Sequence, residues 1–381
     1  MVNARVWRGL VRQRLWKTAA AAGIAVTGVG AGVAVSGGVA GANPTPAGTA
    51  AATWLASQLQ GPTADHFDTP TFHPTTPTVG LTADGLFAFA AAGTTSGTTF
   101  SPEVAAIATW LSTPTNTFVA NYIEKPTPTA PTTLKYVPGA VAKVALAADV
   151  AGATPRTFIS GTDLVADLEG TIDATGELHG FFSNPTTQAL AIIVLEHNDP
   201  GYPTLPAAVT FLENQACTTG GYPSTYTFSP CTLAGGDVDT TGAVAQALLY
   251  YGTVAGDAGA VLAGEVASTW LDSVKTVSTV GPTQVTWRNH CTFTSFTTTF
   301  PSVNSTALAV EGLVPDPRSA TAPFATDITG GVSWLEAAQN TTPMTPTAGS
   351  LPACTATGPG NVRATTQGVQ GLTGTPYTAL I

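Results

Sequence analysis

The sequence predicts an all-α fold of six helical hairpins, arranged as an inner and an outer ring of helices. A Trp-Leu-like phrase recurs six times, at residues 53–55, 109–111, 166–168, 210–212, 269–271 and 333–335. A second phrase follows it each time, at residues 81–84, 138–141, 186–189, 240–243, 305–308 and 365–368. Two phrases in strict alternation are typical of a helix pair that is repeated around an array.

Both phrases have the periodicity of an α-helix. Apolar residues recur at i, i+3, i+4 and i+7 in residues 104–111 for the first phrase, and residues 241–248 show the same spacing for the second. We expect helix caps at Asn184, Asp239 and Asn304, whose side-chain oxygens can accept a free backbone N–H. Small residues fill the second phrase and let helices approach closely, which places it in the inner ring and the tryptophan-bearing phrase outside.

The composition indicates a folded chain with a large core. Of 381 residues, 44% are apolar and only 9% are charged, and the net charge is -10. Basic residues are sparse beyond the N-terminus, so the chain has no means of neutralising a row of phosphates. We therefore expect no nucleic-acid partner. The two phrases alternate without interruption along the chain, which predicts one domain over residues 43–381.

Residues 1–42 have the organisation of a signal peptide. Basic residues lie between positions 5 and 17, an uncharged run covers Thr18 to Val39, and Ala40-Gly41-Ala42 supplies small residues for cleavage. We expect cleavage after Ala42 and secretion of the mature chain. An uncleaved membrane anchor is the alternative, because the run is about long enough to span a bilayer. No other apolar run approaches that length, so the mature chain is not expected to span a membrane.

The four cysteines favour disulfides, because an even number in an exported chain is typical of an oxidising compartment. The four cysteines can form two disulfides in three different ways. Cys217 and Cys231 lie in one loop, while Cys291 and Cys354 occupy the same slot in consecutive repeats, so we favour Cys217–Cys231 and Cys291–Cys354. A zinc site is the rival interpretation, although no C-x-x-C motif occurs. We expect neither a metal nor a cofactor.

Long loops rich in Pro, Thr and Gly separate the two helices of a repeat, and one of them carries a recognisable motif. Gly220-Gly221-Tyr222-Pro223, followed by the run from Asp237 to Ala245, resembles the repeats of the prenyltransferase and squalene-oxidase families. Those families include protein prenyltransferase β subunits, squalene-hopene cyclases and the α domain of cobalamin carriers. The resemblance covers roughly residues 45–381, is closest to exported bacterial members and cobalamin carriers, and implies an α/α toroid.

The resemblance raises one catalytic hypothesis. Asp237-Val238-Asp239-Thr240 is similar to the Asp-x-Asp-Asp motif of class II terpene cyclases, in which Asp239 would match the general acid and Asp237 its neighbour. Thr240 replaces the last acidic residue, and Asn304 takes the place of Asp239 one repeat later, which favours a helix cap. The Asp-x-Cys of prenyltransferases does not occur in the sequence. Acidic i, i+4 pairs such as Asp163 and Asp167 lie on or after an outer helix and are interpreted as solvated charges.

The expected function is therefore binding rather than catalysis. We expect an exported, non-catalytic toroid that holds a small molecule or an envelope component at the barrel mouth. A cyclase-like enzyme using Asp239 and a structural cell-surface protein are the alternatives, and the oligomeric state stays open. The ligand candidates are aromatic residues in or beside the central loops, namely Tyr222, Tyr226, Tyr250, Tyr251 and Trp287.

Overall fold

The computed structural model describes residues 46–68, 77–96, 100–124, 136–227, 231, 235–278, 283–289, 300–340, 348–352 and 361–381. Six helices lie outside: α2 (Pro46–Ala56), α4 (Ser101–Ser112), α7 (Leu164–Glu169), α9 (Leu205–Glu213), α11 (Ala258–Val274) and α13 (Phe324–Ala338). Six alternate with them and lie inside: α3 (Val79–Ser96), α6 (Pro138–Val150), α8 (Pro185–Asn198), α10 (Val238–Ala255), α12 (Val303–Leu313) and α14 (Val362–Thr373). The short helix α5 (Thr117–Ile123) precedes α6, and the 3-10 helix η3 (Tyr377–Ala379) follows α14.

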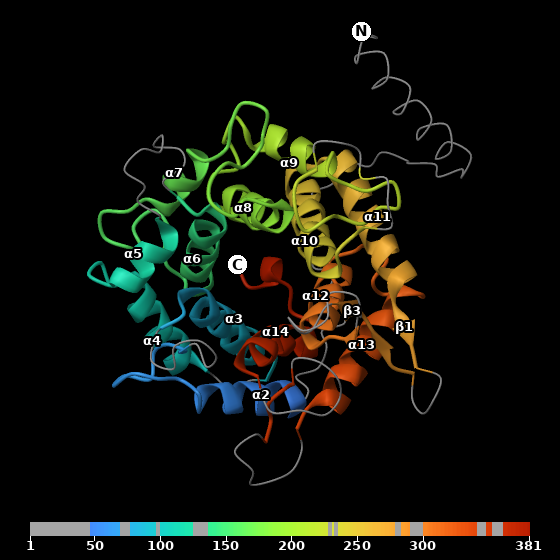
Figure 1. The fold of residues 1–381 in the computed structure, drawn as a ribbon, viewed down its shortest axis with the longest axis horizontal. Helices are drawn as coiled ribbons and strands as arrows, with labels where there is room; N and C mark the ends of the chain where they lie inside the picture. The colour runs from blue at the N-terminus through green and yellow to red at the C-terminus, as the bar shows by residue number, and fades with distance from the viewer. Residues whose placement is uncertain are drawn as a thin grey trace, which may run out of the picture. The chain divides into compact units, whose positions relative to one another are not determined.

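The inner helices form a closed ring within the unit Val39–Ile381. Each of them packs against the next one in chain order, and α14 packs against α3 to complete the circle (Figure 1). A hydrogen bond from Gln339 Nε2 to the carbonyl of Ala47, 2.9 Å long, joins the last outer helix to the first. The predicted α/α toroid, with six hairpins in two rings, is confirmed.

The tryptophan-bearing phrase lies on the outer helices, as predicted. The leucine of each phrase is fully buried, at Leu55, Leu111, Leu168, Leu212, Leu271 and Leu335. Trp54, Trp270 and Trp334 are also buried, with at most 8% of their surface exposed. These side chains form the layer between the two rings, and burial of such large apolar groups is the main source of the toroid's stability.

Close packing explains the glycines of the second phrase and of the family-like loop. A Cβ on Gly242 in α10 would lie 2.3 Å from the carbonyl oxygen of Leu308 in α12, so only glycine permits this contact between inner helices. A Cβ on Gly221 would lie 2.4 Å from the Trp270 ring, which shows that the double-glycine loop passes directly over that tryptophan.

In four of the six inner helices, a threonine hydroxyl one turn into the helix holds the loop that enters it. The threonine four residues after the cap accepts a backbone N–H from that loop at 2.9 to 3.2 Å. The pairs are Thr82 with Phe67, Thr241 with Tyr222, Thr306 with Trp287 and Thr365 with Leu351. In α8 this position is Gln188, which accepts the N–H of Leu178. The sequence alignment put Thr187 and Thr366 here and was wrong by one residue in both repeats.

The observed N-cap residues differ from the predicted ones in two of three helices. Asn184 caps α8 in a capping box, as expected. However, Asp237 rather than Asp239 caps α10, accepting the Thr240 N–H at 2.8 Å. Ser302 rather than Asn304 likewise caps α12. The helices begin two residues earlier than predicted, so Asp239 and Asn304 lie inside the first turn.

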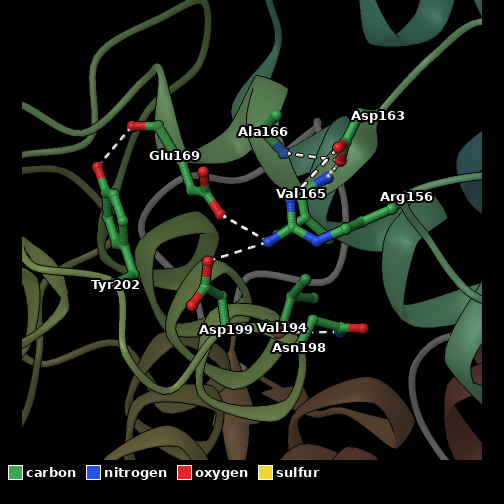
Figure 2. A network of polar contacts seen from close by, with 9 residues as sticks. All are labelled: Arg156, Asp163, Val165, Ala166, Glu169, Val194, Asn198, Asp199 and Tyr202. Atoms are coloured by element: carbon green, nitrogen blue, oxygen red, sulfur yellow. Dashed lines mark hydrogen bonds and ion pairs between the residues drawn. The ribbon is translucent and has the colours of Figure 1, made fainter.

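An ion-pair network joins the connection after α6 to the ends of α7 and α8. The Arg156 guanidinium lies 3.3 Å from Asp163, 3.1 Å from Glu169 and 3.0 Å from Asp199 (Figure 2). Asp163 also caps α7. These acidic residues therefore join the ends of α7 and α8 to the connection after α6.

Two short antiparallel strand pairs precede α12. Strand β1 (Thr276–Val277) pairs with β2 (Val285–Thr286), and β3 (Arg288–Asn289) pairs with β4 (Phe300–Pro301). Cys217 and Cys231 form the predicted disulfide in the loop between α9 and α10. Cys291, Cys354 and residues 1–42 lie outside the described residues, so those predictions stay open. Within the described ranges, no helix is both long and apolar enough to cross a membrane.

Candidate functional site

The inner helices present equivalent positions toward the centre of their ring. The residues that precede them are Thr78, Val137, Asn184, Asp237, Ser302 and Asn361. Counted from there, the second, sixth and ninth residues share one helix face. We call these three sets the mouth, middle and floor levels. Contact between Lys143 of α6 and Asp84 of α3, both at the middle level, shows that this face points inward.

Exposure falls from the mouth to the floor. At the mouth level Arg363 is exposed, and Gly80, Gly139, Thr186, Asp239 and Asn304 are partly exposed. At the middle level the exposed fractions are 4% for Asp84, 7% for Leu190, 3% for Ala243 and 8% for Leu308. At the floor level they are 0% for Phe87, Leu146, Gln246 and Glu311, and 1% for Ile193 and Gln370. The centre of the ring therefore opens at the N-terminal ends of the inner helices and is closed at the floor.

A buried ion pair lies at the middle level. Lys143 Nζ is 2.8 Å from Asp84 Oδ1, and the two side chains are 20% and 6% exposed. Burial alone would lower the pKa of Lys143, but the Asp84 carboxylate outweighs that effect and the pKa is raised. The lysine is thus charged, and it compensates the charge of the carboxylate in a largely dehydrated place.

A neutral acid lies beneath this pair. Glu311 is fully buried, and among the described residues neither carboxyl oxygen has a hydrogen-bond partner in good geometry. Burial raises its pKa well above the usual value; the adjacent Gln246 amide opposes this shift and the charge of Asp84 adds to it. Burial thus favours the protonated form of Glu311, which lies beneath the Lys143–Asp84 ion pair.

The segment after α14 forms the floor. The chain turns back at Gly374, which has φ 59, and runs into the ring of inner helices (Figure 1). The backbone N–H of Tyr377 donates to Gln246 Oε1 at 2.9 Å, and its ring stands edge-on to Phe87 at 5.3 Å. Burial, with smaller contributions from Asp84 and Glu311, raises the pKa of Tyr377 well above its usual value. We call Asp84, Lys143, Gln246, Glu311 and Tyr377 the central cluster.

Positive charge gathers between the mouth and the central cluster. Tyr122 of α5 lies over α3, where a Cβ on Gly80 would be 2.6 Å from its hydroxyl. Burial raises the pKa of Tyr122, while the charges of Lys143 and Arg363 lower it and that of Asp84 adds to it. These four residues therefore lie within electrostatic reach of one another. The two cations are accompanied there by the Asp84 carboxylate.

The predicted site residues lie in other places. Asp237 caps α10, and Asp239 lies at the mouth level of the same helix. Tyr222 and Trp287 are core residues with 1% and 0% exposure, and Tyr251 is 6% exposed.

The other two ligand candidates are hydrogen-bonded or near such a contact. Tyr226 donates to Gln188 Oε1 at 2.7 Å, and Tyr250 Oη lies 3.5 Å from His197 Nδ1. None of the five aromatic residues is part of the central cluster, and their role as ligand contacts stays a prediction. No group of three or more His, Cys, Asp or Glu side chains suited to a metal occurs in the described part of the chain.

The sequence analysis missed the central cluster. Asp84 and Glu311 each lie alone within an apolar inner helix, in Ala83-Asp84-Gly85 and Val310-Glu311-Gly312. An ionisable residue inside a strongly apolar helical pattern carries a desolvation cost, and this is the signal that was available. It did not reveal that the two residues meet, because they belong to different repeats.

Comparison with known proteins places the fold. No family model and no curated protein matches the sequence. Solved structures of unsaturated glucuronyl hydrolases do match, each over 86% of this chain and 95% of the other. One, from Bacillus sp. GL1, is described as responsible for the degradation of glycosaminoglycan and has a TM-score of 0.55 at 12% identity.

The other two structures match equally well. A variant determined with the oligosaccharide dGlcA-Glc-Rha-Glc has a TM-score of 0.54 at 11% identity. An enzyme specific for heparin has a TM-score of 0.54 at 10% identity. At such identities the likeness establishes a shared α/α toroid fold.

This finding corrects the expected function. We expected a non-catalytic binding protein, with a terpene-cyclase-like enzyme or a structural surface protein as alternatives. The structures that share the toroid along most of this chain are glycan-degrading enzymes, so the expectation of a non-catalytic protein is wrong. The cyclase alternative, with Asp239 as its acid, is unsupported by the same comparison.

Proposed function

We propose that this chain is a carbohydrate-processing enzyme that hydrolyses a glycosidic bond at the central cluster. The observation that carries the proposal is the pairing of a neutral Glu311 with the lysine-bound carboxylate of Asp84. Two carboxyl groups held in opposite protonation states are the requirement for acid–base hydrolysis of glycosides. The fold shared with glucuronyl hydrolases supports the same reaction class.

The reaction balances with these two residues alone. Glu311 transfers its proton to the glycosidic oxygen as the bond between that oxygen and the sugar carbon breaks. Water forms the new bond to that carbon, and its proton passes to Asp84. Proton exchange with solvent then restores Glu311 to the acid and Asp84 to the carboxylate. Lys143 orients the Asp84 carboxyl group through the 2.8 Å contact.

The mouth favours an acidic sugar. Among the described basic residues, Arg156, Lys275 and Arg318 have carboxylate partners remote from the mouth. Arg363 has no such partner within 4.0 Å among the described residues, and it lies within electrostatic reach of Lys143. A sugar carboxylate could bind Arg363 through charge-assisted hydrogen bonds.

Sugar release tests the proposal. The purified chain is incubated with dGlcA-Glc-Rha-Glc and with heparin-derived oligosaccharides, and products are followed by mass spectrometry. We expect release of one sugar by the parent protein, and loss of at least about a hundredfold in rate for Glu311→Gln and Asp84→Asn. Glu196→Gln is the matched control, because Glu196 is a buried glutamate on an inner helix whose pKa is also raised by burial. Full activity in Glu311→Gln would refute the assignment.

We also propose that the protein acts outside the cell, after removal of residues 1–42. The basic region, the uncharged run and Ala40-Gly41-Ala42 support this proposal. N-terminal sequencing of the exported protein should give Asn43 as the first residue. The kinship with prenyltransferase and squalene-oxidase repeats is likewise kept as a proposal, supported by the Gly220-Gly221-Tyr222 loop over Trp270.

A further inference from the structure

Buried polar atoms without partners gather on one side of the inner ring. Among the described residues, such side-chain atoms occur on α10, α12 and α14, and none on α3, α6 or α8. They include Asn304 Oδ1, Ser305 Oγ and Gln367 Oε1, together with Gln246 Nε2 and the carboxyl oxygens of Glu311, which interact with each other but outside good hydrogen-bond geometry. Proteins normally pair buried polar groups, so several orphans on adjacent helices need an explanation.

These atoms follow the face that points to the centre. Asn304 is at the mouth level, Gln367 at the middle level, and Gln246 and Glu311 at the floor level. The column therefore descends from the open end of the ring to the neutral acid. We call Asn304, Gln367, Gln246 and Glu311 the polar column.

Apolar side chains face the polar column. At the floor level α3, α6 and α8 carry Phe87, Leu146 and Ile193, whereas α10, α12 and α14 carry Gln246, Glu311 and Gln370. At the middle level α3 and α6 carry the Asp84–Lys143 ion pair, while Leu190 of α8, Ala243 of α10 and Leu308 of α12 add slightly exposed apolar surface. A pyranose ring has the same division, with hydroxyl groups around its edge and C–H groups on its faces.

We propose that Asn304 and Gln367 bind the hydroxyl groups of the sugar residue that is cleaved, and so determine which sugar is accepted. This inference rests on the proposed function, since the bound sugar is the one that lies above Glu311. The amide oxygens of Asn304 and Gln367 accept hydrogen bonds from the sugar hydroxyls. In the free protein both oxygens are buried and unpartnered, at a cost in stability that ligand binding removes.

Paired measurements of stability and affinity test this role. The variants are Asn304→Leu, Gln367→Met and their combination. Thermal unfolding is measured for each, and binding of dGlcA-Glc-Rha-Glc is measured by calorimetry in an Asp84→Asn background that prevents turnover. Because each substitution removes an orphaned atom at similar volume, we expect a higher melting temperature together with roughly tenfold weaker binding per substitution.

Two controls separate this role from a structural one. Ser268→Ala removes an orphaned hydroxyl on the outer helix α11 and should raise the melting temperature without changing affinity. Gln188→Met removes a buried inner-helix amide that bonds to Gly176, Ala208 and Tyr226, and should lower the melting temperature. The two controls show how the melting temperature changes when a buried polar group without a partner is removed and when a hydrogen-bonded one is removed.

Each outcome decides the matter. A lower melting temperature in Asn304→Leu and Gln367→Met, or unchanged affinity, would overturn the inference and leave the proposed function in place. Binding that depends on Asn304 and Gln367, without any sugar release by the parent protein, would overturn the proposed function alone. Absence of binding by the parent protein would overturn the inference as well.

Discussion

Glu311 and Asp84 lie on the two inner helices that flank α14, and the charge of Asp84 adds to the burial that keeps Glu311 protonated. Lys143 Nζ lies 2.8 Å from the other carboxyl group, Asp84 Oδ1. The arrangement gives two chemically similar residues different surroundings, one fully buried and the other beside a cation. It depends on closure of the ring, because α3 and α12 come from the first and fifth hairpins.

Removal of the lysine should leave a buried charge uncompensated. We expect Lys143→Met to lower the free energy of unfolding by about 3 kcal/mol, because Asp84 then loses its partner in a dehydrated site. Urea unfolding measures this. The double variant Lys143→Met with Asp84→Asn should recover most of the loss, and a double variant no more stable than Lys143→Met would contradict the coupling.

The threonine that holds each entering loop should be important for stability. Thr241→Val removes the acceptor for the Tyr222 N–H, which is buried, so we expect a loss of about 1–3 kcal/mol. Thr329→Val is the matched control, since that hydroxyl is exposed and bonds only to its own helix. Equal melting temperatures for the two variants would argue against the loop-holding role.

Stability should depend on pH through Asp149. Burial raises its pKa to about 6, against a smaller opposing effect of Asn198 and His197. Since the folded-state pKa lies above the unfolded value of 3.8, the protonated form favours folding at low pH, and this contribution is lost as pH rises through 6. We expect Asp149→Asn, which keeps the acceptor for Asn198, to raise the melting temperature at pH 7 and to leave it unchanged near pH 4. Parallel pH profiles of parent and variant would exclude Asp149 as the source.

Replacement of Phe182 by glycine should relieve strain in the backbone. This residue has φ 61 and is 72% exposed, so its ring gains little from packing. Phe182→Gly should therefore stabilise the protein by about 1 kcal/mol, because glycine adopts a left-handed φ without a steric cost. Thermal unfolding measures the change. A lower melting temperature in this variant would mean that the phenylalanine ring contributes packing.

The ring architecture was predictable because each repeat has the same spacing of apolar residues. Trp270 and Leu271 follow helical spacing, and their burial between two rings leaves only one arrangement of the hairpin. The exact start of the inner helices was harder to predict. Thr186-Thr187 and Thr365-Thr366 offer two equivalent threonines, so the sequence does not distinguish the residue that contacts the loop.

The central cluster was less predictable for a physical reason. Neither Asp84 nor Glu311 belongs to a motif, and their electrostatic interaction arises only when helices from distant repeats come together in the ring. The catalytic hypothesis fell on Asp237 and Asp239 because they lie two positions apart in a motif similar to Asp-x-Asp-Asp. In the structure Asp237 is occupied with capping α10, which is a local role that any helix start of this type requires.

Hydrolysis in oxygen-18 water tests the roles of Glu311 and Asp84 most directly. The parent protein and Glu311→Gln are each incubated with dGlcA-Glc-Rha-Glc in labelled water, and the mass of the released sugar is determined by mass spectrometry. Acid–base hydrolysis predicts one labelled oxygen on the sugar released by the parent protein, and no release by a folded Glu311→Gln variant. A product without label, or undiminished release by Glu311→Gln, would contradict it.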